Sequence, residues 1–340
     1  MAQTAPNTES PPNGVSSPAH DQQKDNDADF PQPPYLPSGV ALIGGRPTVA
    51  VDIPILVVLL LLYAGGAIGN ASIFFRNRKR GHFFPMSMAM FGFCMSRIAT
   101  CSVRMAWAAH PSNANLAMAA TIFAAVGILI VFVIVLILAQ RILRATHPKL
   151  GWSRTVSGSL KATYFGLFIA IVLLIAFTVL SYFTLNSNLR NIAMWIQRAG
   201  ILYMLLFNLL GPVLLLLSLM LARPTETATP DNFGIRSTMA SKYIILSVTM
   251  FFTLFIVGFR VGTAWADARP ASDPAWWERK AAYYVIQYGF EVVIVYWLIL
   301  TRFDQKFWIP NKSHGPGDYS RKTAFDTSKT EASGDEFQQA

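Results

Sequence analysis

The chain has few charged residues, few histidines and almost no cysteine, and these shortages exclude several classes of protein. Charged residues make up 14% of the 340 residues, whereas a soluble domain normally has about a quarter. The two cysteines, Cys94 and Cys101, lie on one predicted helix too far apart to bridge each other, so a disulfide framework is excluded. The five histidines all lie outside the apolar segments. Because a zinc site needs several converging ligands, we expect no metal site.

Motifs for catalysis are missing as well. The sequence has no Gly-x-Ser-x-Gly elbow, no Walker loop and no Gly-x-Gly-x-x-Gly stretch. The last apolar segment has no lysine that a retinal Schiff base would need. We therefore expect a protein that is not an enzyme and that needs no cofactor.

What the sequence does have is apolar residues, which make up 53% of it. They occur in blocks of roughly 20, the length that crosses a bilayer as a helix. The sequence predicts an all-α fold, a bundle of seven transmembrane helices. The predicted spans are Val51–Phe75, Phe84–Ala109, Leu116–Ala139, Tyr164–Leu185, Ala199–Leu221, Tyr243–Trp265 and Ala281–Thr301.

Lysine and arginine are distributed unevenly between the loops, which predicts the orientation. The loops after the first, third and fifth spans contain twelve of them, and the loops after the second, fourth and sixth contain five. This places the N-terminus outside and the C-terminus inside. The same asymmetry accounts for most of the formal charge of +10, so no nucleic acid partner is needed to explain it.

The ends of the chain differ in composition from the spans. Residues 1–49 contain nine prolines and almost no lysine or arginine, a composition that cannot bury enough apolar surface to fold alone. We therefore expect a disordered, Pro-rich extracytoplasmic tail over 1–49, a seven-helix transmembrane domain over 50–302, and a cytoplasmic tail over 303–340.

Charged residues inside the spans are costly in a bilayer and usually face the bundle interior with a partner. Arg97 and Arg104 lie almost two turns apart on one face of the second span. The predicted orientation places Arg97 and Glu291 of the seventh span at the same depth. We therefore expect a buried ion pair between Arg97 and Glu291.

The outer half of the predicted bundle has a surplus of arginine. Arg104 and Arg260 lie there, with Asp52 as the nearest carboxylate inside a span. Gln287 and Tyr284 precede Glu291 by one and two helical turns. One interpretation is an outward-facing polar cavity in which Arg104, Arg260, Gln287 and Tyr284 bind an anionic or polar small ligand. The alternative is an interhelical network that only fixes the packing.

Four stretches, "FGFCMSRIAT", "LILAQRILRATHPKLGW", "GFRVGTAW" and "DPAWWERKAAYYV", give the chain a resemblance to a known family. The chain resembles a family of fungal seven-span integral membrane proteins that is catalogued as a domain of unknown function, over roughly residues 48–312. Some members are labelled receptor-like, but the resemblance implies no ligand. The third span ends in Gln140-Arg141-Ile142 and not Asp-Arg-Tyr, which departs from the rhodopsin-like receptors that couple to G proteins.

These observations favour a receptor-like sensor in the lipid bilayer, and they favour the plasma membrane over internal membranes. The basic loop Arg141–Lys161 would then be the contact for a cytoplasmic signalling partner. The alternatives are a small transporter or lipid-handling protein for an anionic substrate, and a structural membrane organiser. Ligand-induced change without flux would indicate the receptor, and flux into vesicles the transporter.

Overall fold

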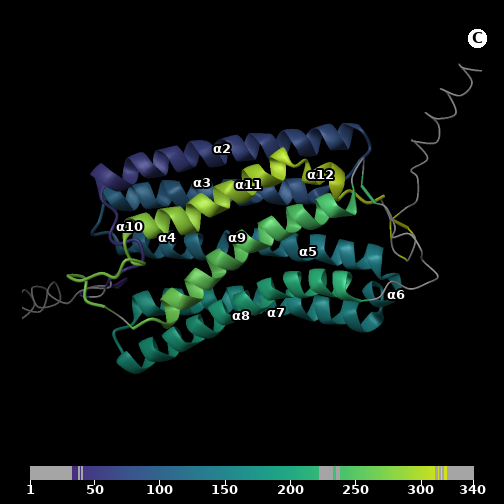
Figure 1. Cartoon of the computed structure of the whole chain (residues 1–340). Helices are drawn as coiled ribbons and strands as arrows, with labels where there is room; N and C mark the ends of the chain where they lie inside the picture. The colour runs from purple at the N-terminus through teal and green to yellow at the C-terminus, as the bar shows by residue number, and fades with distance from the viewer. Residues whose placement is uncertain are drawn as a thin grey trace, which may run out of the picture.

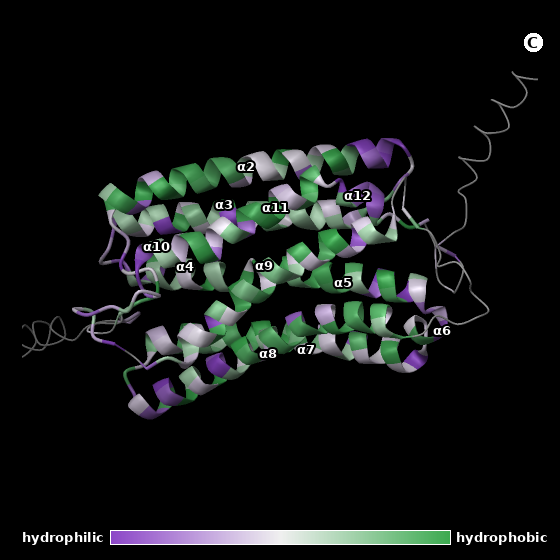
Figure 2. Ribbon diagram, in the orientation of Figure 1, coloured by the Kyte–Doolittle hydropathy of each residue, from purple (hydrophilic) through white to green (hydrophobic). Residues whose placement is uncertain are grey.

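The structure is a computed structural model, and it describes residues 33–36, 39, 41–221, 233–234, 238–267, 269–310, 313, 315 and 318–319. Seven helical segments of the described chain are long and apolar enough to cross a membrane, which confirms the predicted number of spans. Their middle parts are apolar and the polar residues gather toward both ends of the bundle (Figure 2). The parts of the predicted tails over 1–32 and 320–340 lie outside the described residues.

Figure 1 shows the helices side by side, running back and forth. We call the end where α2 begins the N-terminal end of the bundle, and the end where α12 lies the C-terminal end. The elements are α2 (Val49–Lys79), α3 (Pro85–Ala109), α4 (Ala114–Val126), α5 (Leu129–Thr146), α6 (Pro148–Gly151), α7 (Arg154–Phe183), α8 (Ser187–Met220), α9 (Met239–Trp265), α10 (Lys280–Ala282), the π-helix η1 (Tyr283–Gly289), α11 (Phe290–Leu300) and α12 (Phe303–Lys306).

The third span is the central one. In its most apolar stretch 67% of the residues are buried, against 17% for α7. Its second half, α5, contacts α3, α8 and α9. This position suits its sequence, because a helix that is apolar on all sides is typical of the middle of a bundle.

This central span is broken, which the uninterrupted apolar pattern did not predict. Helix α4 ends at Val126 and α5 begins at Leu129, with Gly127 and Ile128 between them. Phe123 O still accepts from the Gly127 amide at 3.4 Å, but the break leaves the carbonyls after it without their usual partners along the helix, so other donors must satisfy them.

Two of the predicted loops are largely helical. Helices α7 and α8 begin at Arg154 and Ser187, well before the apolar segments predicted at Tyr164 and Ala199. Each begins at a capping side chain: Ser153 accepts from the Val156 amide, and Asn186 accepts from the amides of the next turn. Capping of this kind fixes where a helix starts independently of hydropathy.

The segment Ala41–Thr48, predicted as part of the N-terminal tail, packs on the N-terminal end of the bundle. The Ala41 amide donates to Arg269 O at 2.9 Å, and the Gly44 amide donates to Glu278 O at 2.9 Å. At the other end, α12 is also packed, since Phe303 and Phe307 are 0% exposed. The folded unit therefore extends beyond residues 50–302 on both sides.

Candidate functional site

An ion pair between α3 and α11 lies at the centre of the bundle. Arg97 Nη2 is 2.5 Å from Glu291 Oε1, and both side chains are 0% exposed. Tyr63 of α2 donates its hydroxyl to the other carboxylate oxygen of Glu291 at 3.1 Å. The Arg97 guanidinium also lies over the rings of Phe93 and Tyr288. The structure thus brings together the two residues that depth matching paired, and Tyr63 joins them.

Arginines also cap the broken third span. Arg97 Nη1 donates to Ala124 O at 3.3 Å and to Phe123 O at 3.4 Å, and Arg260 Nη1 of α9 donates to Ala125 O at 3.1 Å. Cationic donors at a helix C-terminus satisfy its last carbonyls and complement the negative end of its dipole. The break and the buried arginines therefore stabilise each other.

Gly127 offers a test of this arrangement. A Cβ atom there would lie 3.0 Å from Arg97 Cζ and 3.0 Å from Ser96 Oγ, whereas a Cβ at Gly258 of α9 would meet nothing within 4 Å. We expect Gly127→Ala to lower the free energy of unfolding by about 1–3 kcal/mol, because it overpacks the held guanidinium. Gly258→Ala should raise it by about 0.5–1 kcal/mol. Unfolding in mixed detergent measures both. Stabilisation by Gly127→Ala as well would contradict the placement of Arg97.

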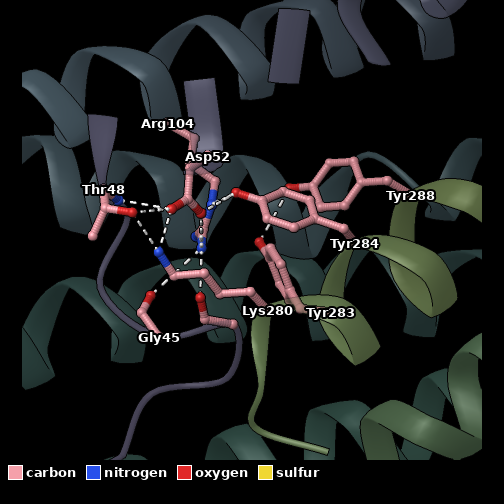
Figure 3. Close-up of polar contacts among 9 residues, drawn as sticks. Gly45, Thr48, Asp52, Arg104, Lys280, Tyr283, Tyr284 and Tyr288 are labelled. Carbon is pink, nitrogen blue, oxygen red and sulfur yellow. Dashed lines mark hydrogen bonds and ion pairs between the residues drawn. The ribbon is translucent and has the colours of Figure 1, made fainter. Parts of the chain in front are cut away.

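A second polar cluster closes the N-terminal end between α2, α3 and α10 (Figure 3). Asp52 is 0% exposed and pairs with Lys280. Its Oδ1 accepts from the Tyr284 hydroxyl at 2.5 Å, and its Oδ2 accepts from the Thr48 amide at 2.7 Å. Arg104 Nη2 lies 4.0 Å from Asp52 Oδ1. We call these five residues the Asp52 cluster.

Arg104 lines a cavity at this end, as expected, but its donors are largely satisfied within the Asp52 cluster, which differs from the expectation that it awaits an anion. Its Nη2 donates to Gly44 O at 3.1 Å, and its Nε donates to the Tyr284 hydroxyl at 3.0 Å. The guanidinium carbon lies 4.5 Å from the centre of the Tyr283 ring. These contacts tie α3 to the segment before α2, so the geometry gives Arg104 a structural role.

A cavity of about 460 Å³ lies beside these clusters at the N-terminal end. Its volume is in the range of small-molecule sites. Helices α3, α4, α7, α8, α9 and η1 form its walls, and residues of the 41–45 segment line it as well. Among the residues that line it are Arg104, Arg260 and Gln287, three of the four predicted ligand-binding residues. Tyr284 is directed instead at Asp52.

Two polar side chains at the cavity have donors to spare. Gln287 is 6% exposed, and its amide has no hydrogen bond to any described residue. Arg260 makes the single bond to Ala125 O, and no carboxylate of a described residue lies within ion-pair distance of it. A guanidinium has five N–H donors. The cavity therefore presents an amide and a cation whose donors are open to a ligand.

Sequence reasoning missed Arg198 and Glu278 as cavity residues, because both were assigned to loops. Arg198 lies within α8, which starts earlier than its apolar segment, and its Nε donates to Ala264 O at 2.9 Å. Glu278 is 8% exposed, and its Oε2 accepts from the Ala275 amide at 2.7 Å. The capping residue Asn186 is the one sequence feature that indicates the early start of α8.

The C-terminal end of the bundle is filled by the chain itself. Phe303 packs edge-on against Phe84 at 5.3 Å, and Asn77 donates to Asp304 at 2.8 Å. Arg141, predicted as part of the contact loop for a signalling partner, donates to Phe307 O at 2.7 Å. Its guanidinium thus belongs to the internal packing of this end.

Seven apolar helices with charged residues paired between them define a class: the chain is compatible with a multi-pass membrane protein in a lipid bilayer. Among the described residues, no group of three or more His, Cys, Asp or Glu is placed to hold a metal ion. No protein-family model, no curated protein and no solved structure matches the chain.

Proposed function

We propose that this protein is a receptor-like sensor of the plasma membrane that binds an anionic or polar small ligand in the cavity. The N-terminal end of the bundle faces outside and the C-terminal end inside. The support for this orientation is the twelve-to-five split of lysine and arginine between the loops.

The observation that carries the proposal is the pair of unused donors at the cavity. Gln287 and Arg260 lie on neighbouring spans and line one cavity. Glu291 attracts Arg260 at longer range, but its carboxylate is paired with Arg97, so no carboxylate of the described residues forms a direct ion pair with Arg260. A buried cation without a carboxylate is costly, and an anion from solution removes that cost. The satisfied contacts of Arg104 move the proposed site away from it, toward Arg260 and Gln287.

A sensor fits the structure better than a transporter because the other end of the bundle is packed. Phe303 and Phe307 are 0% exposed there, and Arg141 and Asn77 hold this segment by hydrogen bonds. Alternating access would require this whole packing to open. The exposed Arg154 and Lys161 on α7 are the residues that we propose for contact with a cytoplasmic partner.

Cysteine accessibility in sealed vesicles tests the proposal. Cys94 and Cys101 are 0% exposed and will not compete for reagent. Thr263→Cys lines the cavity, Ser272→Cys lies in the exposed loop after α9, and Ser159→Cys lies on α7 near the C-terminal end. External, membrane-impermeant methanethiosulfonates should modify the first two and spare the third. An anionic reagent should be favoured over a cationic one about 10-fold more at Thr263→Cys than at Ser272→Cys.

The preference should vanish with Arg260→Gln and persist with Arg279→Gln, since Arg279 is exposed and does not line the cavity. At least one of acetate, succinate, benzoate and decanoate should protect Thr263→Cys without accumulating in the vesicles beyond protein-free controls. External labelling of Ser159→Cys would overturn the orientation. Protein-dependent uptake of a protecting anion would replace the sensor by the transporter.

A further inference from the structure

The walls of the cavity are mostly apolar, which narrows the chemistry of its ligand. Helix α4 presents Ala120, Ala124 and Ala125, whose small side chains leave room, and Leu174 of α7 and Ile201 of α8 lie among the other lining residues. Ligand sites usually combine such walls with a few polar groups that fix orientation. A small, fully hydrated anion would leave these walls unused.

Few charged side chains line the cavity, and their contacts show which of them are already paired. Arg104 shares Asp52 with Lys280, and its donors are taken up by Gly44 O and the Tyr284 hydroxyl. Arg198 donates to Ala264 O, and its guanidinium lies over the rings of Trp195 and Trp265. Glu278 accepts from a backbone amide, and Asp267 is exposed. Arg260 is thus the cation at the described cavity with no carboxylate in ion-pair distance and no aromatic ring beneath it. Glu291 attracts it at longer range but is paired directly with Arg97. A single such cation matches a single negative charge.

The position of Arg260 sets which way the ligand lies. Its bond to Ala125 O holds it beside the last turn of α4, next to the break at Gly127. Gln287, 6% exposed, lines the same cavity from η1. Ala120 and Ala124 lie on the turns of α4 that precede this point. A charged group at Arg260 therefore leaves the rest of the ligand to lie along the alanine face of α4.

We propose that the cavity binds an amphipathic monocarboxylate, whose carboxylate pairs with Arg260 and Gln287 and whose apolar body lies against Ala120, Ala124 and Leu174. This inference rests on the proposed function and names the ligand class for the same site. A carboxylate accepts two parallel bonds from a guanidinium, and the Gln287 amide donates a third. The apolar body contributes by removing hydrocarbon from water.

A matched series of ten-carbon probes tests this inference on the full-length protein in nanodiscs of zwitterionic lipid. Decanoate, decanol and decyltrimethylammonium share the chain and differ in charge, and acetate shares the carboxylate and lacks the chain. Binding is read by isothermal titration calorimetry, after subtraction of the heats measured with empty nanodiscs. Decanoate should bind, decanol about 10- to 100-fold more weakly, and acetate and the cation more weakly still.

Four variants separate the contributions of charge and apolar contact. Arg260→Gln should weaken decanoate about 10- to 100-fold and leave decanol unchanged, whereas Arg279→Gln should change neither. Ala124→Leu fills the apolar part of the cavity and should abolish binding of both probes. If Arg260→Gln fails to fold because α4 loses its cap, Gln287→Met should still weaken decanoate selectively.

The outcomes distinguish this inference from the proposed function. If acetate or succinate binds as tightly as decanoate with the same dependence on Arg260, the amphipathic class is wrong and the sensor proposal stands. If decanoate binds equally to wild type, Arg260→Gln and Ala124→Leu, it binds elsewhere and this inference is overturned. Decanol binding as tightly as decanoate would also overturn it, because the carboxylate would then contribute nothing.

Discussion

Replacing either member of the Arg97–Glu291 pair alone will lower the free energy of unfolding by about 3–5 kcal/mol, and replacing both will lower it by far less than the sum. Each single variant leaves one charge at 0% exposure without its partner. Arg97→Met and Glu291→Leu remove the charges while keeping apolar volume, so the double variant restores a neutral interior. Buried pairs replaced together by apolar residues often lose little stability.

The cycle is measured by reversible unfolding in mixed micelles, with all four proteins under one detergent composition. Tyr63→Phe is an informative companion, since it removes the bond to Glu291 Oε2 but no charge. It should cost about 1.5–3 kcal/mol, the value of a hydrogen bond to a charged group. If the losses in unfolding free energy caused by Arg97→Met and Glu291→Leu are strictly additive, the two residues do not form a stabilising pair.

The second large effect is expected at the other buried carboxylate. Asp52→Ala should lower the free energy of unfolding by about 3 kcal/mol, because Arg104 and Lys280 then face each other without a counter-charge. The same change should speed hydrogen exchange of the Thr48 and Gly44 amides, since the Asp52 cluster fixes this segment against α2 and α3. Hydrogen-exchange mass spectrometry of the peptide over 41–52 reads this directly.

A matched control for Asp52 lies in the loop after α9. Asp273 pairs with Arg269 at 3.7 Å, but its side chain is 82% exposed. Asp273→Ala should therefore change stability by less than about 1 kcal/mol. Equal effects at Asp52 and Asp273 would show that burial of the Asp52 cluster does not matter, and would contradict the geometry in Figure 3.

Hydropathy and charge patterns predicted the spans because they reflect the free energy of transferring each segment from water into lipid. Depth along the helices was enough to match Arg97 with Glu291, since few charges compete inside the spans. The break at Gly127 was not predictable in this way, because the hydropathy of an apolar segment is the same whether the segment forms one helix or two. The role of Arg260 as a cap depends on that break, so it was missed for the same reason.

Arg104 illustrates a different limit of sequence reasoning. Its partners include Gly44 O and Gly45 O, which belong to a segment whose composition predicted a disordered tail. Backbone carbonyls are present in every residue, so no residue type indicates that they will accept a bond. The sequence does have more arginines than carboxylates in the outer half of the predicted bundle, but main-chain carbonyls accept some of the hydrogen bonds of these arginines. Among the arginines that line the cavity in the described part of the chain, Arg260 has a single side-chain hydrogen bond, to Ala125 O.

The π-helix η1 lies in the seventh span between Lys280 of the Asp52 cluster and Glu291 of the buried ion pair. Its wider turns hold more residues than an α-helical stretch of the same length. If Tyr283–Gly289 tightened to α-helical bonding, the side chains within and before this segment would rotate by about 100° for each residue of register shift relative to Glu291. Gln287 at the cavity and Tyr284 on Asp52 would turn together. Winding of one short segment therefore connects the cavity, the Asp52 cluster and the ion pair at the centre of the bundle.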